Sequence, residues 1–339
     1  MQFLESVSLA PFTTFGIGGD ARWFTEASSE EDIRAAIAFA GKRGLPVFVL
    51  GSGSNLLVSD HGFPGLVLRV GLRGVQQEGH VFHVAAGEDW DAFVRHTVSL
   101  DYGGVECLAG IPGTAGATPV QNVGAYGQEV SETITAVRAY DTEQERFVTL
   151  TAAECGFAYR RSIFNTKKRG RYVVTAVSYA LRPHAAPRLT YADLQRRFPA
   201  GSQPSLAEVS TAVREIRHGK GMLLVPGEPD CHSAGSFFKN PVVDGAHYER
   251  IAAKSAVPVP FYPAEEGRVK LPAAWLVEQA GFGKGYGEGP VGISSKHTLA
   301  LVNRGGAKAS DVLALATKIL QGVYKKFGVT LEMEPVVVA

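Results

Sequence analysis

The sequence predicts a mixed α and β protein built from two or three packed units. At 339 residues the chain is longer than the ~250–300 residues at which single hydrophobic cores stop growing. Segments with helical apolar periodicity also alternate with short strand-like apolar runs. The expected boundary is 183–205, because four prolines interrupt it: Pro183, Pro187, Pro199 and Pro204.

The first half is expected to alternate helices with short strands. Residues 29–44, "SEEDIRAAIAFAGKRG", place apolar side chains on one helical face and end at Gly44, a typical helix stop. Pro46 then opens "PVFVL", a short apolar run that predicts a buried strand. A second helix is expected at 89–100. The remaining strands are expected at 56–60, 65–70 and 81–87.

The second half is expected to begin with a helix over 205–220. Ser205 and Glu208 form a capping-box pattern, and apolar residues recur at helical spacing behind them. Two further helices are expected at 272–281 and 309–328, the latter stopped by Gly328. The chain then continues as a strand-like segment, "VTLEMEPVVVA".

Composition excludes several classes of protein. With 45% hydrophobic residues, 20% charged residues and a formal charge of +1, the composition gives no general attraction to nucleic acid or to an anionic membrane, and any anionic partner must be held by local charges. The three cysteines show no metal spacing and predict free thiols in a reducing cytoplasm, with no metal site. No basic leader precedes a long apolar stretch, and no run of ~20 apolar residues predicts a membrane span.

The loop "GSGSN", residues 51–55, follows a predicted strand. It does not match a dinucleotide fingerprint, because Leu56 stands where the third glycine belongs and no helix follows. Successive backbone N–H groups from Gly51 to Asn55 could instead form an anion-binding nest for phosphate. A plain β-turn is the structural alternative.

A second glycine-rich loop, "LAGIPGTAGATPVQNVGAYG", covers 108–127. It contains two prolines and almost no charge, whereas a solvent loop would normally carry more Asp, Lys or Ser. The composition suits a backbone wrapped closely around a flat or pyrophosphate-bearing ligand. A third segment, "TTFGIGGDARWF" near the start, is a weaker candidate for the same ligand-binding role.

These stretches, together with "YRRSIF", "AGSFFKNP", "VKLPAAWLVEQAG", "SKHTLALVN" and "LEMEP", run in family order across nearly the whole chain. The chain thereby resembles the flavin-dependent UDP-N-acetylenolpyruvoylglucosamine reductases, also called UDP-N-acetylmuramate dehydrogenases. The resemblance implies an α+β fold with an FAD-binding domain of the vanillyl-alcohol-oxidase type in two subdomains, 1–70 and 71–204. It also implies a substrate domain over 205–325 and a C-terminal strand, 326–339, that returns to the active site.

The resemblance further implies a reaction. NADPH would reduce non-covalently bound FAD, and the reduced flavin would reduce the vinyl ether of UDP-N-acetylglucosamine enolpyruvate to UDP-N-acetylmuramate for peptidoglycan precursor synthesis. A cytoplasmic monomer is expected. The FAD-binding residues expected from the two loops are Gly51, Ser52, Gly53, Ser54, Asn55, Leu56, Gly113, Thr114, Gly116, Ala117, Gln121, Asn122, Gly124 and Ala125.

Three residues match the family's catalytic positions. Arg160 would stabilise the enolate carboxylate, since a guanidinium fork suits that group, whereas Arg161 could be a surface charge. Ser236 would donate a proton to carbon, although from the residues alone it could be a helix N-cap. Glu334 would stabilise or protonate the intermediate at the opposite end; periodicity alone would equally allow Glu332 to be the buried one.

Cations and donors must also hold the UDP diphosphate, because a buried unpaired phosphate is costly. The family-matched substrate residues are Tyr191, Lys220, Lys239, Asn240, Tyr262 and His297. His297 could equally be a structural hydrogen-bonding residue. Two departures from the family pattern are the long segment 221–235 and the short tail after Glu334, which begins with Pro335.

Two other functions are weighed. A flavin-dependent alcohol oxidase of the same fold would need neither the catalytic trio nor diphosphate cations. Such oxidases sometimes attach flavin through a histidine near the first glycine loop, which draws attention to His61, although no attachment is expected here. A non-catalytic UDP-sugar or flavin-binding regulator is the third possibility, and the presence of all three catalytic candidates argues against it.

Overall fold

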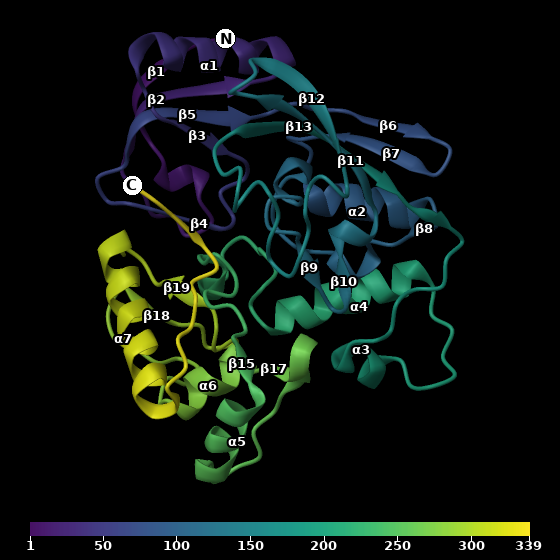
Figure 1. Ribbon diagram of the computed structural model, residues 1–339, viewed down its shortest axis with the longest axis vertical. Coiled ribbons are helices and arrows are strands. Elements are labelled where there is room, and N and C mark those ends of the chain that lie inside the picture. Colours follow the sequence, from purple (N-terminus) through teal and green to yellow (C-terminus); the bar gives the residue numbers. More distant parts are fainter. The chain divides into compact units, whose positions relative to one another are not determined.

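A computed structural model describes residues 1–339, which form two units (Figure 1). The first unit comprises Met1–Val7, Asp20–Gly53 and Phe63–Gly219. The second comprises Ser8–Gly19, Ser54–Gly62 and Lys220–Ala339. The first unit therefore extends past the expected boundary at residue 205, and the expected four-part division by function remains a prediction.

One sheet of the first unit has the strand order β1 (Leu4–Ser8), β2 (Asp20–Ala27), β5 (Phe63–Val70) and β3 (Val47–Leu50). Helix α1 (Glu30–Arg43) packs on β2 and β5, begins with a Ser29–Asp32 capping box and ends at Gly44 with φ of 61°. The strand predicted from "PVFVL" is present as β3. The prediction that it is buried was only partly right, because β3 lies at the sheet edge and exposes 38% of Val49.

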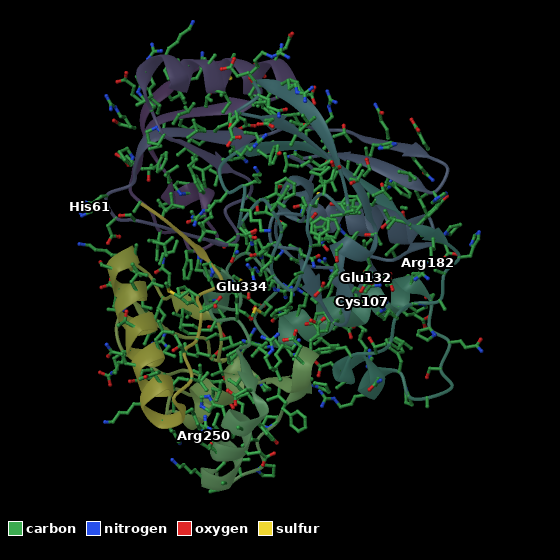
Figure 2. The ribbon with its side chains drawn as sticks, in the orientation of Figure 1. His61, Cys107, Glu132, Arg182, Arg250 and Glu334 are labelled. Atoms are coloured by element: carbon green, nitrogen blue, oxygen red, sulfur yellow. The ribbon has the colours of Figure 1, made fainter.

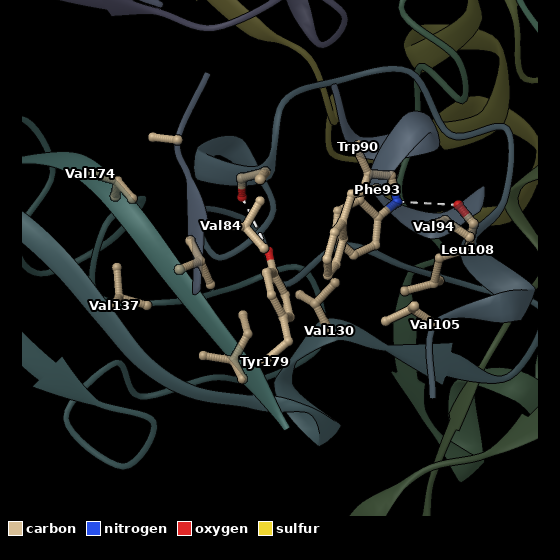
Figure 3. Close-up of a cluster of buried hydrophobic side chains, with 14 of the residues drawn as sticks. Val84, Trp90, Phe93, Val94, Val105, Leu108, Val130, Val137, Val174 and Tyr179 are labelled. Carbon is tan, nitrogen blue, oxygen red and sulfur yellow. Dashed lines mark hydrogen bonds between the residues drawn. The ribbon is translucent and has the colours of Figure 1, made fainter. Parts of the chain in front are cut away.

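The second sheet is antiparallel, in the order β12 (Arg146–Thr151), β11 (Ile134–Asp141), β13 (Tyr172–Ala180), β7 (Val81–Ala85) and β6 (Val75–Glu78). Helix α2 (Trp90–Ser99) packs on it through Trp90 and Phe93, whose rings contact Tyr179 of β13 (Figure 3). The Trp90 Nε1 donates to the Leu108 carbonyl at 3.2 Å. This aromatic core fixes the start of the second glycine-rich loop.

Helix α4 (Leu206–Gly219) packs in the first unit against α2 and α3 (Ala192–Arg197). Its capping box is confirmed: Ser205 accepts from the Glu208 N–H, and the Glu208 carboxylate accepts from the Ser205 N–H. The short strands of this unit are β8 (Tyr102–Gly103), β9 (Gly124–Ala125), β10 (Gln128–Glu129) and β14 (Arg182–Pro183). Its 3-10 turns are Glu106–Leu108, Ala115–Ala117 and Val130–Glu132.

The second unit contains a three-stranded sheet and a hairpin. The sheet has the order β15 (Val242–Asp244), β17 (Arg268–Lys270) and β16 (Tyr262–Pro263), and the hairpin pairs β18 (Val291–Ile293) with β19 (Leu301–Asn303). The helices are α5 (Gly245–Lys254), α6 (Ala273–Gln279) and α7 (Ala309–Phe327). Its 3-10 turns are Ala10–Phe12, Pro229–Cys231 and Glu265–Gly267.

The C-terminal segment differs from the single strand expected over 329–339. Phe238 and Met333 form an isolated bridge, whereas β20 (Val336–Val338) pairs in parallel with β4 (Leu56–Val58). The segment changes partner at Pro335, because proline has no N–H with which to continue a ladder. Among the helices of the whole chain, none has both the length and the apolar character required to cross a bilayer.

Candidate functional site

The two glycine-rich loops meet in the first unit. A Cβ added to Gly51 would lie 3.0 Å from the Thr114 Oγ1 and 3.8 Å from the Ala117 Cβ. Gly116 packs still more tightly, since an added Cβ would lie 2.4 Å from the Ala86 Cβ. The predicted cofactor loops therefore lie against each other, and Gly116 is required by packing.

The loop "GSGSN" connects strand β3 to strand β4 and not to a helix, as the sequence predicted. Gly53 adopts a left-handed conformation, with φ of 69°. Asn55, at the end of this loop, belongs to the second unit. Its Nδ2 donates to the Glu334 carbonyl at 3.4 Å, and its own carbonyl accepts from the Val336 N–H at 2.9 Å. The phosphate-nest candidate is thus joined directly to the C-terminal segment.

Asn122 of the second loop is buried, with φ of 46°. Its Nδ2 donates to Glu129 at 2.7 Å and to the Ala158 carbonyl at 3.1 Å, while its Oδ1 accepts from the Ser131 N–H. The side chain of Asn122 therefore stabilises the conformation of the loop. Because its amide group is used in these bonds, any contact of Asn122 with a cofactor would come from its backbone.

Arg160 lies against this same loop. Its Nη2 donates to the Gly124 carbonyl at 2.6 Å and its Nη1 to the Asn122 carbonyl at 3.5 Å. The Arg160 backbone is left-handed, with φ of 55°, and its carbonyl accepts from Asn165. Arg161 is exposed. The structure therefore places the guanidinium of Arg160, and not that of Arg161, at the predicted flavin loop.

Ser236 lies in an extended segment of the second unit, where it bridges with Ala300. It begins no helix, so the N-cap interpretation is wrong. The next residue, Phe237, donates its N–H to the Leu299 carbonyl at 2.7 Å and accepts from the Glu334 N–H at 2.9 Å. Phe237 and Phe238 are 0% and 1% exposed, so their buried rings hold this segment in place.

Glu334 and Glu332 have different surroundings. Glu332 exposes 76% of its side chain and pairs with the Lys239 Nζ at 3.3 Å. Glu334 is half-buried, on the segment that leads from α7 to β20 (Figure 2). Burial therefore favours Glu334 as the functional carboxylate, in agreement with the choice made from the motif.

The remaining substrate candidates of the second unit carry structural bonds as well. The Asn240 Oδ1 accepts from the Ala273 N–H at 2.9 Å and so caps α6. The His297 Nδ1 accepts from the Leu299 N–H at 3.1 Å, which supports its structural interpretation. Tyr262 is 49% exposed, and Lys220 is half-buried.

Comparisons with known proteins agree with this arrangement. The family model "FAD binding domain" matches residues 21–151, and "UDP-N-acetylenolpyruvoylglucosamine reductase, C-terminal domain" matches 228–338. A UDP-N-acetylenolpyruvoylglucosamine reductase of Thermobifida fusca is 48% identical, over 99% of this chain and 98% of that protein. A second one, of Streptomyces coelicolor, is 47% identical, over 100% of this chain and 91% of that protein.

The chain belongs to the UDP-N-acetylenolpyruvoylglucosamine reductase family. A crystal structure of such a reductase from Thermus caldophilus aligns with a TM-score of 0.69 at 26% identity, over 100% of this chain and 98% of that one. The α+β fold class with an FAD-binding domain is thereby confirmed. The roles expected of single residues remain predictions.

The sequence analysis did not identify two side chains at this site: one contacts Tyr191, and the other bonds to the second glycine-rich loop. Tyr126, in the second glycine-rich loop, is buried, and burial raises the pKa of its phenol to about 12. Its ring centroid lies 5.3 Å from that of Tyr191, in an edge-to-face contact. Arg217 of α4 donates from Nε to the Gly110 carbonyl at 3.0 Å, and burial lowers the pKa of its guanidinium.

A clue to Arg217 was present in the sequence. It lies four residues after Val213, on the apolar face of α4, where another apolar residue would be expected. A charged residue at such a position indicates a specific buried partner. The partner of Arg217 is the Gly110 carbonyl, in the second glycine-rich loop.

Proposed function

We propose that this chain is an NADPH-dependent flavoenzyme that reduces the enolpyruvyl group of UDP-N-acetylglucosamine enolpyruvate to give UDP-N-acetylmuramate. The observation that best supports this is the backbone pairing of Phe237 with Glu334, which brings the "SAGSFFKNP" and "LEMEP" segments together. Family membership supplies the substrate class.

The two glycine-rich loops fit FAD. The Gly51 backbone reaches the second loop because it carries no side chain, and the loop backbones offer N–H groups suited to a diphosphate. FAD, when bound, would supply hydride from N5 to the terminal carbon of the enolpyruvyl group. The fourteen loop residues from Gly51–Leu56 and from 113–125 named above would hold it without a covalent link.

Arg160, and Glu334 in its protonated form, would stabilise the negative charge that the hydride leaves behind. That charge delocalises onto the substrate carboxylate, so a guanidinium oriented beforehand lowers the barrier. Arg160 is oriented by its bonds to the carbonyls of Asn122 and Gly124. Glu334 would act at the opposite end of the intermediate, held by its N–H bond to Phe237.

Ser236 would then transfer its hydroxyl proton to the α-carbon of the enediolate, forming the new C–H bond and leaving an alkoxide that solvent reprotonates. A serine hydroxyl is a weak acid, so it can do this only for a strongly basic carbon and from a fixed position. The bridge to Ala300 and the bond from Phe237 to Leu299 provide such a position.

Binding of the UDP group would fall to Tyr191, Lys220, Lys239, Asn240, Tyr262 and His297. In this proposal 1–70 and 71–204 form the two parts of the FAD domain, 205–325 binds substrate, and 326–339 brings Glu334. Lys239 would have to exchange its exposed partner Glu332 for phosphate, which is easy because an exposed ion pair is weak.

Colour provides the direct test. The purified protein should be yellow, should bleach with NADPH under anaerobic conditions, and should regain its colour when the enolpyruvyl UDP-sugar is added. Acid denaturation should release the flavin. Consumption of oxygen without NADPH would instead indicate an oxidase, and a protein that takes up no FAD would contradict the proposal.

A further inference from the structure

Segment 221–235, which links Lys220 to Ser236, is bonded to the rest of the second unit at its centre. The Glu228 Oε2 accepts from the Lys296 Nζ at 2.8 Å, with 27% and 35% of the two side chains exposed. The Asp230 Oδ2 accepts from the Ser294 hydroxyl at 2.9 Å and the Ser295 hydroxyl at 2.7 Å. Asp230 is 9% exposed and Ser294 is 0% exposed, so the bond between them is shielded from water, whereas Ser295 is exposed. Two acidic side chains thus join the segment to the turn 294–297.

The start of the segment folds back to the same place. A Cβ added to Gly221 would lie 3.3 Å from the Asp230 Cβ and 3.4 Å from the Lys296 Cδ, and its φ of 63° favours glycine. The loop between them is closed by Cys231, whose Sγ accepts from the Val225 N–H at 3.1 Å. Because Lys220 directly precedes Gly221, its backbone is held beside this contact.

The end of the segment leads to Ser236 through bonds of the same region. The Asn303 N–H donates to the His232 carbonyl at 2.9 Å. The Ser294 N–H donates to the carbonyl of Ala300, the residue that bridges with Ser236. The turn that receives Glu228 and Asp230 is therefore hydrogen-bonded to the backbone that supports Ser236.

Charge supports the same arrangement. The hydrogen bond that Lys296 donates to Glu228 raises the pKa of the Lys296 ammonium, and the nearby Asp230 carboxylate acts in the same direction. The Lys296 ammonium is therefore bonded to one carboxylate and attracted by the other.

We infer that Glu228, Asp230 and Lys296 are positioning residues, and we call these three residues the acidic clamp. Together they hold Lys220 in place to bind the substrate phosphate and Ser236 in place to deliver its proton. This inference rests on the proposed function. It explains how the chain fixes both Lys220 and Ser236 across the segment 221–235 that separates them.

The test compares Glu228→Ala and Asp230→Ala with wild type in both half-reactions. We expect KM for the enolpyruvyl UDP-sugar to rise up to about fivefold for Glu228→Ala, as for a partly exposed ion pair. We expect about tenfold or more for Asp230→Ala, because two hydroxyls lose their acceptor. The solvent isotope effect on flavin reoxidation should increase, while flavin reduction by NADPH should not change.

Two further variants serve as controls. Asp230→Asn keeps an acceptor oxygen for both serines and should remain close to wild type. Glu26→Ala removes a pair of similar length, to Arg69 at 3.1 Å in the first unit, and should leave both half-reactions unchanged. Equal slowing of both half-reactions in the clamp variants would show a merely structural role and overturn the inference.

A second measurement does not depend on the function. Trypsin should cleave after Lys220 faster in Glu228→Ala than in wild type, as followed by mass spectrometry of the fragments. Wild-type protein that is not reoxidised by the UDP-sugar would refute the proposed function, while this cleavage would still test the clamp. If Asp230→Ala does not fold, the Glu228→Ala variant alone tests the inference. Kinetics and a rate of trypsin cleavage equal to those of wild type in Glu228→Ala would overturn it.

Discussion

The backbone N–H of Glu334 donates to the carbonyl of Phe237 at 2.9 Å, so two segments almost a hundred residues apart in sequence are neighbours within the second unit. Phe237 directly follows Ser236. The proposed proton donor and the proposed carboxylate are therefore held by one backbone contact, and variants on its two sides should affect the same half-reaction.

Replacing Ser236 by alanine should slow flavin reoxidation by the enolpyruvyl UDP-sugar by ~10²–10⁴-fold, the usual contribution of a positioned general acid. Flavin reduction by NADPH should be nearly unchanged, because it needs no proton at the substrate carbon. Stopped-flow absorbance of the two half-reactions measures both. Equal slowing of the two would contradict the assigned role.

Glu334→Gln and Glu332→Gln form a matched pair. Glu332 is largely exposed and Glu334 is half-buried, so only the first variant should slow flavin reoxidation strongly. The loss of Glu332 should change KM by no more than a few fold, as expected for an exposed ion pair with Lys239. A larger kinetic effect from Glu332→Gln would reverse the assignment.

Arg160→Lys should slow flavin reoxidation by about 10²–10³-fold, the range for losing one preorganised donor at a developing anion. Lysine lacks the planar fork that reaches the carbonyls of both Gly124 and Asn122. Arg161→Lys is the control, and because Arg161 is exposed it should behave as wild type. Comparable losses in the two variants would remove the special role of Arg160.

Gly116→Ala should destabilise the first unit by about 1–3 kcal/mol, because the new methyl group overlaps Ala86. The amount of FAD that copurifies should fall as well. Gly41→Ala, in helix α1 with open space around it, should instead stabilise by roughly 0.5–1 kcal/mol. Thermal unfolding and flavin absorbance test both variants. An unchanged unfolding temperature and FAD content in Gly116→Ala would show that the loop can move to accommodate the methyl group.

Stability should fall in acid partly through Asp141. Two bonds from Arg171, at 3.0 and 2.7 Å, hold the pKa of this buried carboxyl below its usual range. A depressed pKa stabilises the fold at pH values above the unfolded-state pKa, and that stability disappears as pH falls through the folded-state pKa. The difference in unfolding free energy between wild type and Asp141→Asn should therefore be largest near neutral pH and shrink in acid. A constant difference down to pH 3 would contradict this.

Local signals in the sequence were enough to place several elements. The capping box at Ser205 and the glycine stops at Gly44 and Gly328 are present as predicted, because each depends on residues within one helical turn. The two glycine-rich loops were also recognisable in the sequence, since a backbone that packs as closely as at Gly51 and Gly116 leaves little room for a side chain.

The conformation around Ser236 could not be predicted in this way. Its partners, Leu299 to Ala300 and Glu332 to Glu334, lie more than sixty residues further along the chain, and no local pattern encodes them. Periodicity likewise could not separate Glu334 from Glu332, because their difference in burial comes from tertiary packing. The internal bonds of Asn122 and Asn240 were missed for the same reason.

The parallel pairing of β4 with β20 has a consequence for the order in which the protein is made. Every residue of the first unit, up to Gly219, leaves the ribosome before β20 is translated. The first unit can therefore fold first, while β4 remains unpaired until its partner strand is made. The first unit would be complete before the chain carries Glu334, so folding of that unit and assembly of the proposed catalytic residues would be separate events in synthesis.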